Sequence, residues 1–219
     1  MAGSSVILQE WPSFPKNLTR EGTFERGKLP FCGRVPSWEA LGLEKGRQSA
    51  VVVVCTEAKG RECVICVERS ASMRRHAGQL AFPGGVREPQ DFSPVETAFR
   101  ECYEELGLPP EKFRLKGALP KEYAYSSDFV IYPFVAEISC EEIDRRIEPD
   151  PVELHSAFLV RLESLKQPPE LYWGSSVRGS FMYPVFRLDG KRSIWGATAR
   201  ILWRFLRSPE AFRGAIRCP

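Results

Sequence analysis

Three glutamates, Glu101, Glu104 and Glu105, fall within little more than one turn of a predicted helix, close to its carboxyl end. At about 100° per residue they lie within a ~100° arc of one face. Like charges at this spacing repel by about 0.2–0.5 kcal/mol per pair. Each also faces the negative end of the helix dipole, at about 0.3–1 kcal/mol. The alternative is a solvated face on which Arg100 pairs with Glu96 or Glu104; the energetic conflict favours a bound cation.

A hard divalent cation would remove this conflict, because Mg²⁺ takes carboxylate oxygens and completes its octahedron with water and substrate phosphate. We therefore predict that the three glutamates hold Mg²⁺, with Mn²⁺ as an alternative ion. The sequence Phe-Pro-Gly-Gly at 82–85 lies just upstream. Since glycine permits close backbone approach, Gly84 and Gly85 are expected to lie against the site, with Gly85 offering a carbonyl to the metal.

The helix that carries these glutamates has well-marked ends. Ser93 and Glu96 form a capping box, Pro94 occupies the favoured first helical position, and Gly107 stands where a C-terminal glycine belongs. Between these ends, an apolar stripe at spacings of three and four consists of Val95, Ala98, Phe99, Cys102 and Leu106. Glu105 lies nearest to this stripe, so we expect it to be the most buried of the three glutamates.

The remaining pattern indicates an α/β fold with a mixed sheet packed by helices. Two apolar runs, at 50–57 and 62–69, flank a turn and predict a hairpin of largely buried strands. Further strands are predicted near 113–119, 129–138, 156–162 and 181–188, and a final amphipathic helix at 197–208.

The first 48 residues differ from the rest of the chain. They are rich in Pro and Gly but contain the aromatic residues Trp11, Phe14, Phe24, Phe31 and Trp38. This is too much aromatic surface for a disordered tail. We predict an arm at 1–48 that packs on a domain at 49–207, followed by a C-terminal tail at 208–219.

Composition narrows the functional class. The net charge of +3 is too small to indicate nucleic acid binding. The seven cysteines are odd in number and thinly spread, which suggests a reducing compartment. Cys63 and Cys66 lie in a predicted strand and are interpreted as core thiols, not metal ligands. The longest apolar run is too short to span a bilayer, and the first residues resemble neither a signal nor a transit peptide. A cytoplasmic protein without membrane contact is expected.

The glycine turn and the acidic helix resemble the Nudix box, whose general pattern is G-x5-E-x7-R-E-U-x-E-E-x-G-U, with U a bulky aliphatic residue. Gly85 opens the box and Arg100 begins its closing part. Asp91 occupies the first acidic position, with eight residues instead of seven between it and Arg100, and Cys102 replaces an aliphatic residue. The resemblance implies a Nudix-like α/β/α sandwich, with a mixed β-sheet between helices, and metal-dependent hydrolysis of a nucleoside diphosphate linked to another group.

A second match lies upstream of the box. Nudix enzymes that cleave coenzyme A carry R-[SA]-x3-R-x3-G-x3-F-P-G-G, which is matched here by Arg69, Ser70, Arg74, Gly78 and the sequence at 82–85. The resemblance covers about 50–206. It implies cleavage of coenzyme A or acyl-CoA into 4′-phosphopantetheine, or its acyl form, and adenosine 3′,5′-bisphosphate. Arg69 and Arg74 would then contact the substrate phosphates, since arginine suits bidentate phosphate binding.

Catalysis also needs a carboxylate that accepts a proton from water. Glu105 is one candidate because of its expected burial. Glu153 is another, because its segment resembles one that supplies a late acid in relatives; the alternative is an ordinary surface glutamate. Arg100 is expected to pair with an acid of the box and orient the loop, or else to form an exposed pair within the helix. Arg75 and His76 are interpreted as solvated.

Two rival functions stay open on the sequence. The same chemistry could act on a nucleotide sugar, a dinucleotide or capped RNA, although the upstream arginine motif favours coenzyme A. A non-catalytic Nudix-fold binding module is the rival from another class, but such modules usually lose glutamates of the box. The expected partner is a small nucleotide, and a homodimer is left open.

Overall fold

The computed structural model describes residues 9–10, 37–41, 47–69, 79–125, 127–141, 143, 154–165, 168–176, 179–189 and 192–208. Its strands are β1 (Gln9–Glu10), β2 (Arg47–Ala58), β3 (Arg61–Arg69), β4 (Leu80–Ala81), β5 (Gly84–Val86), β6 (Arg114–Ala118), β7 (Glu122–Ala124), β8 (Phe129–Glu137), β9 (Leu154–Arg161), β10 (Glu170–Ser176), β11 (Gly179–Arg187) and β12 (Ser193–Ile194). The helices are α1 (Trp38–Leu41), α2 (Pro94–Leu106) and α4 (Gly196–Leu206), with 3₁₀ turns η1 (Pro110–Lys112) and η2 (Leu162–Leu165). No helix in these ranges is long and apolar enough to cross a membrane.

A mixed sheet forms the centre of the fold. In the described residues its main path runs β1-β9-β3-β2-β8-β6, and the short strands β4, β5 and β7 pair with β3, β2 and β8 respectively. The pairing of β2 with β8 is parallel, whereas its pairing with β3 is antiparallel. The predicted hairpin is confirmed: Lys59 and Gly60 join β2 to β3 with φ of 52° and 70°, the positive values that a tight hairpin turn requires.

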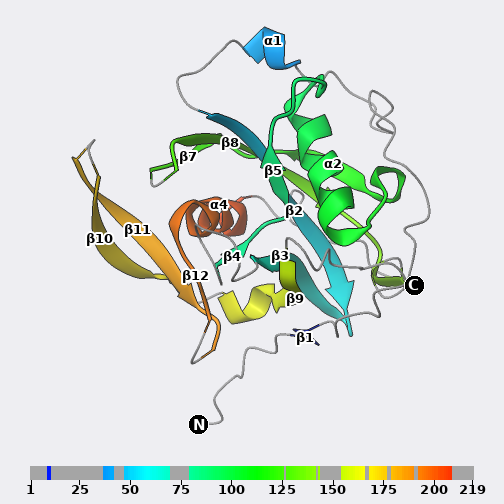
Figure 1. Cartoon of the computed structure of the whole chain (residues 1–219). Helices are drawn as coiled ribbons and strands as arrows, with labels where there is room; N and C mark the ends of the chain where they lie inside the picture. Colours follow the sequence, from blue (N-terminus) through cyan, green and yellow to red (C-terminus); the bar gives the residue numbers. More distant parts are fainter. Residues whose placement is uncertain are drawn as a thin grey trace.

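One helix covers each face of this sheet. Val95, Phe99 and Leu106 of α2 pack with alternate residues of β2 and β3 on one side. Leu202 and Phe205 of α4 pack on the other side. Figure 1 shows the sheet between these two helices. The predicted α/β/α sandwich is therefore confirmed, and the periodicity of each helix explains it, because a single apolar stripe faces the sheet.

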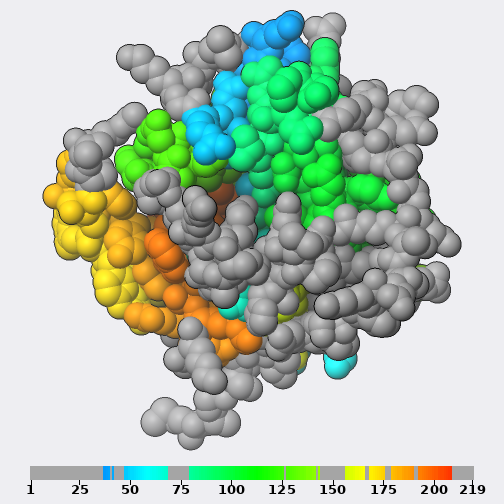
Figure 2. Space-filling model, viewed as in Figure 1, coloured from blue at the N-terminus to red at the C-terminus, as the bar shows by residue number. Residues whose placement is uncertain are grey.

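A second, smaller sheet was not predicted from the sequence. Within the described residues it has the order β10-β11-β12, and only β11 matches a predicted strand. Leu171 and Trp173 of β10 are exposed, so this strand lacks the buried run or clean alternation that reveals a strand in a sequence. The ribbon of β10 and β11 stands apart from α2 on the surface of the molecule (yellow to orange in Figure 2).

Little of the predicted arm lies in the described residues. Gln9 and Glu10 pair antiparallel with Leu159 and Phe158 of β9, and Trp38 is 1% exposed. These two pieces contact the domain; that the whole of 1–48 packs on it stays a prediction. The boundaries at 48 and 208 stay predictions, because most of 1–48 and 209–219 lies outside the described residues.

The two cysteines of the C-x-x-C pattern are core thiols, as predicted. Cys63 belongs to the core on the α2 side of the sheet, and Cys66 belongs to the core on the α4 side. Residues three apart in a strand point to opposite faces, so the two sulfurs cannot share a metal ion. Burial raises the pKa of Cys63 to about 11 and that of Cys66 to about 12, which leaves both thiols protonated.

Candidate active site

Helix α2 begins and ends as its sequence predicts. Ser93 is the N-cap, and its hydroxyl accepts a hydrogen bond from the N–H of Glu96 at 3.3 Å. In a standard capping box the Glu96 carboxylate would accept from the N–H of the N-cap residue; here it accepts from the N–H one residue earlier, that of Phe92, at 2.7 Å. Gly107 ends the helix with φ of 69°. These local interactions fix where the glutamates of the last turn lie.

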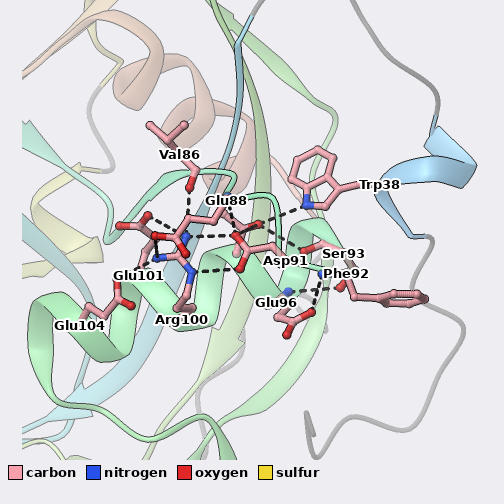
Figure 3. Close-up of polar contacts among 11 residues, drawn as sticks. Trp38, Val86, Glu88, Asp91, Phe92, Ser93, Glu96, Arg100, Glu101 and Glu104 are labelled. Atoms are coloured by element: carbon pink, nitrogen blue, oxygen red, sulfur yellow. Dashed lines mark hydrogen bonds and ion pairs between the residues drawn. The ribbon is translucent and has the colours of Figure 1, made fainter. Parts of the chain in front are cut away.

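Arg100 is the centre of the candidate site. Its side chain is buried, and its Nε and Nη2 donate to the two carboxylate oxygens of Asp91 at 3.0 and 3.1 Å. The same guanidinium donates to Glu101 at 3.0 Å, to Glu104 at 2.8 Å and to the carbonyl of Val86 at 3.0 Å (Figure 3). It therefore ties the loop that follows β5 to the acidic end of α2, as predicted, and is not an exposed pair.

Asp91, at the first acidic position of the box, accepts hydrogen bonds at both of its carboxylate oxygens. Besides Arg100, the N–H of Glu88 and the hydroxyl of Thr97 both donate to its carboxylate at 2.9 Å. Burial by itself would raise the pKa of Asp91, but the hydrogen bond from Arg100 and those from Glu88 and Thr97 outweigh it and hold the pKa below its usual value. The shorter aspartate at this position therefore still anchors the loop, by gripping Arg100.

The three glutamates differ in exposure, as the apolar stripe predicted. Glu105 is buried, Glu101 is partly exposed and Glu104 is exposed. The carboxylate of Glu105 accepts a hydrogen bond from the N–H of Gly84 at 2.9 Å. Each of the three acids thus has a positive or donor partner: Arg100 for two of them and the glycine turn for the third. These partners offset the repulsion among the three carboxylates, so the repulsion alone is not evidence for a bound metal ion.

The two glycines of the turn are required for different reasons. Gly84 has φ of 143°, and a Cβ on it would lie 2.3 Å from the carbonyl oxygen of Ala50 and 2.5 Å from the Cα of Val51. Gly85 instead faces Glu101: an added Cβ would lie 2.3 Å from one oxygen of that carboxylate and 2.7 Å from the other. Gly84 lets β5 pair closely with β2, and Gly85 makes room for the Glu101 carboxylate.

Gly85→Ala is therefore expected to lower kcat by on the order of 10²-fold, because the Glu101 carboxylate must move by about an ångström or more. The melting temperature should stay near that of the wild type, since the displaced group is the end of a flexible side chain. Gly84→Ala is the matched comparison. It collides with backbone, so its main effect should be a lowered melting temperature. Equal loss of stability in both variants, measured by thermal unfolding, would contradict this assignment.

The carboxylate and carbonyl oxygens of the site are the type of ligand that a hard divalent ion takes, although they do not surround a single point. Among the described residues, no three His, Cys, Asp or Glu side chains are placed to hold a metal ion together. Glu101 and Glu104 are held near each other by Arg100, and Gly85 leaves free the space beside the Glu101 carboxylate that a Cβ would fill. Oxygen donors on one helix turn beside bare backbone are the ligand type that Mg²⁺ takes.

A pocket of about 430 Å³ opens on the other side of the glycine turn. Gly84 and Gly85 form part of its wall, and aromatic side chains from three other segments line it, including Tyr125, Phe181 and Trp195. The rings of Tyr125 and Phe181 are stacked with centroids 4.7 Å apart. A mainly apolar pocket that shares a turn with a carboxylate cluster is typical of a ligand site. The sequence did not reveal it, because its walls come from β7–β8, β10–β11 and the start of α4.

Three predicted site residues lie wholly or partly outside the described residues. Arg74 and Glu153 lie outside the described residues, and so does the side chain of Arg69, whose backbone ends β3 beside Leu154 of β9. Their roles stay predictions. Two residues that contact the site were missed by sequence reasoning, Thr97 and Trp38, because neither belongs to a recognisable motif.

The sequence profile of the NUDIX domain matches residues 46–177. The chain belongs to the Nudix family. It is 32% identical over 161 residues to an uncharacterized Nudix hydrolase, NudL, of Photorhabdus laumondii, covering 73% of this chain and 84% of that protein. It is also 31% identical over 177 residues to the mitochondrial coenzyme A diphosphatase NUDT8 of Mus musculus, covering 78% of this chain and 83% of that protein. This Nudix protein is thus a hydrolase that acts on phosphorus-containing anhydrides.

Proposed function

We propose that this Nudix hydrolase cleaves the diphosphate linkage of coenzyme A or acyl-CoA with Mg²⁺ as its cofactor. The products are 4′-phosphopantetheine, or its acyl form, and adenosine 3′,5′-bisphosphate. The observation that carries the choice of substrate is the 31% identity to the mouse coenzyme A diphosphatase over 83% of that protein's length. The upstream motif with Arg69 and Arg74 supports the same choice.

Glu101, Glu104, Glu105 and the carbonyl of Gly85 would hold the ion. Bound Mg²⁺ supplies positive charge for the diphosphate and makes a coordinated water more acidic. The chain's own part is to keep the carboxylates in place. Arg100 holds Glu101 and Glu104 through adjacent nitrogens, and the Gly84 N–H holds Glu105. Oriented donors of this kind cost no rearrangement during the reaction.

A carboxylate must take the proton of the attacking water. Glu105 is the candidate within the described residues: its side chain is buried, and the N–H of Gly84 holds its carboxylate in a fixed position. Glu153 is the second candidate. Separate Glu105→Gln and Glu153→Gln variants distinguish them, because the loss of the acceptor should remove the acid limb of the pH–kcat profile, whereas the loss of a ligand should weaken metal binding.

The pocket beside the glycine turn provides room for the organic group next to the scissile diphosphate. Gly84 and Gly85 line it on one side, and Glu101 lies against Gly85 on the other. A substrate that lies across the turn would therefore place phosphates near the carboxylates and an uncharged group among the aromatic side chains. Arg69 and Arg74 would contact the remaining phosphates of coenzyme A.

The deciding experiment is product analysis after incubation of the full chain with coenzyme A and Mg²⁺. Mass spectrometry should detect 4′-phosphopantetheine and adenosine 3′,5′-bisphosphate in equal amounts, and neither product with EDTA. A panel of acetyl-CoA, ADP-ribose, a nucleotide sugar, a dinucleoside polyphosphate and capped RNA tests the choice of substrate. Full activity on ADP-ribose with none on coenzyme A would defeat the proposed substrate while leaving the Nudix chemistry intact.

We also propose a reducing location, the cytoplasm, for this activity. Cys55, Cys63, Cys66 and Cys102 are buried thiols that form no disulfide bond. Localisation of the tagged full chain by microscopy and fractionation tests this, and recovery in an oxidising compartment would contradict it.

A further inference from the structure

Trp38 comes from a segment that lies outside the matched NUDIX domain, yet it is one of the largest fully buried side chains among the described residues. Its backbone N–H donates to the carbonyl of Phe92 at 3.0 Å. Its ring meets the ring of Tyr132 edge-on, with centroids 5.0 Å apart, and the guanidinium of Arg87 lies 5.2 Å from its centroid. Trp38 therefore contacts both ends of the loop between β5 and α2.

A continuous series of hydrogen bonds leads from Trp38 to the candidate active site (Figure 3). The indole Nε1 donates to the hydroxyl of Thr97 at 3.2 Å, and that hydroxyl donates to Asp91 at 2.9 Å. Asp91 accepts from Arg100, which in turn holds Glu101. All of these hydrogen bonds join side chains directly, and apart from the glutamate each side chain in the series is buried.

The indole N–H of Trp38 also favours one orientation of the Thr97 hydroxyl. A threonine hydroxyl has one proton and two lone pairs. The proton of Thr97 has two acceptors within reach, the Asp91 carboxylate at 2.9 Å and the Ser93 carbonyl at 3.4 Å. Since the indole N–H occupies a lone pair of this hydroxyl, it favours the orientation in which the proton faces Asp91.

We propose that Trp38 is a positioning residue of the active site, which acts through Thr97 to keep Asp91 and Arg100 in place. Asp91 receives from Thr97 one of the bonds that hold its carboxylate against Arg100. An Arg100 that is less firmly held would be freer to follow Glu101 and Glu104 and to compete with a metal ion for them. The short segment that carries Trp38 then helps to position the active site.

Thr97 allows a matched test. Thr97→Val keeps the shape of the side chain and removes the hydroxyl, whereas Thr97→Ser keeps the hydroxyl. Trp38→Phe removes the indole N–H and keeps an aromatic ring. We expect Thr97→Val and Trp38→Phe to lower kcat for coenzyme A by about tenfold, with KM within about twofold of wild type. Thr97→Ser should stay within about threefold of wild type in kcat, because it rescues the hydroxyl.

Two measurements on the substrate-free protein complete the test. Amide hydrogen exchange in residues 86–93 should be faster in Thr97→Val and Trp38→Phe, and the Kd for Mn²⁺ from electron paramagnetic resonance should rise severalfold. Phe205→Leu, in the core on the α4 side of the sheet, is the control for lost stability. It should leave both readouts at the wild-type level.

The inference is overturned if Thr97→Val and Trp38→Phe retain wild-type loop exchange and Mn²⁺ affinity. It is also overturned if the changes in loop exchange and in Mn²⁺ affinity are no larger than those of a Phe205→Leu variant with the same loss of stability. The kinetic part rests on the proposed substrate, the Mn²⁺ part rests on the proposed metal site, and the loop exchange rests on neither. Faster loop exchange and weaker Mn²⁺ binding in a protein that leaves coenzyme A intact would support the role of Trp38 and reject the proposed substrate.

Discussion

Glu101→Gln is expected to lower kcat for coenzyme A by on the order of 10²–10³-fold, the size of effect seen when one preorganised electrostatic group is removed. The amide keeps the size of the side chain, and its oxygen can still accept from Arg100 as the carboxylate does at 3.0 Å. What is lost is the negative charge, on which a hard cation depends. Steady-state kinetics at several Mg²⁺ concentrations, together with calorimetric titration of the metal, measures both consequences.

The matched control for this substitution is Glu111→Gln. Glu111 lies in the 3₁₀ turn η1 and is exposed, so the variant makes the same chemical change away from the site. It should retain wild-type kcat and metal affinity. Wild-type kinetics in Glu101→Gln would show that this carboxylate is not a metal ligand. Such a result would also contradict the assignment of the helix end as the catalytic centre.

Arg100→Leu is expected to lower the free energy of unfolding by about 3–5 kcal/mol, because it leaves the buried Asp91 without its charge partner. Both side chains of this pair are almost inaccessible, at 2% for Arg100 and 0% for Asp91. Arg100→Leu also frees Glu101 and Glu104 from their shared partner. Urea unfolding of the purified variant measures the loss of stability, and kcat should fall with it.

A double variant shows whether the stranded charge is the cause. Replacing both members of a buried pair by apolar residues is often close to neutral. Arg100→Leu combined with Asp91→Leu should therefore be more stable than Arg100→Leu alone. A double variant that is less stable, by the full sum of the two single effects, would show that the pair is not coupled and would contradict this explanation.

The pH dependence of stability follows from the same pair. The folded-state pKa of Asp91 lies below its usual value, so this group stabilises the fold above its unfolded pKa of about 3.9. That contribution is lost as the pH falls through the lower, folded-state pKa. In Arg100→Leu, burial is no longer opposed by the guanidinium, and the buried acid is easier to accommodate once protonated. The stability difference between wild type and variant should therefore shrink as the pH is lowered from 6 toward 3.

Much of the site was predictable because its signals are local. The caps of α2 set its ends, and its apolar stripe made Glu105 the most buried of the three glutamates. These features depend on residues within about one turn of each other, so they can be read without knowledge of the fold. The β2–β3 hairpin was predictable for the same reason, since Lys59 and Gly60 are adjacent in sequence.

The balance of charge around the glutamates could not be read in this way. Repulsion and the helix dipole argued that the cluster needs a divalent cation, but the structure pairs Glu101 and Glu104 with Arg100, and Glu105 with the N–H of Gly84. Distances between side chains decide such energies, and the spacing of residues in a sequence does not specify them. The metal is therefore supported by the type of donors and by the family, not by repulsion alone.

The family, the acidic helix, the glycine turn and the apolar stripes of the helices that pack on the sheet could all be predicted before the fold was known, because periodicity, capping and motif spacing are short-range properties. The contact of Trp38 with Thr97, 59 positions away, and the pocket built from segments spread between β2 and α4 became visible only in the folded chain. Contacts of this kind form when the whole core closes. Their partners are selected by shape and burial, which no local pattern records.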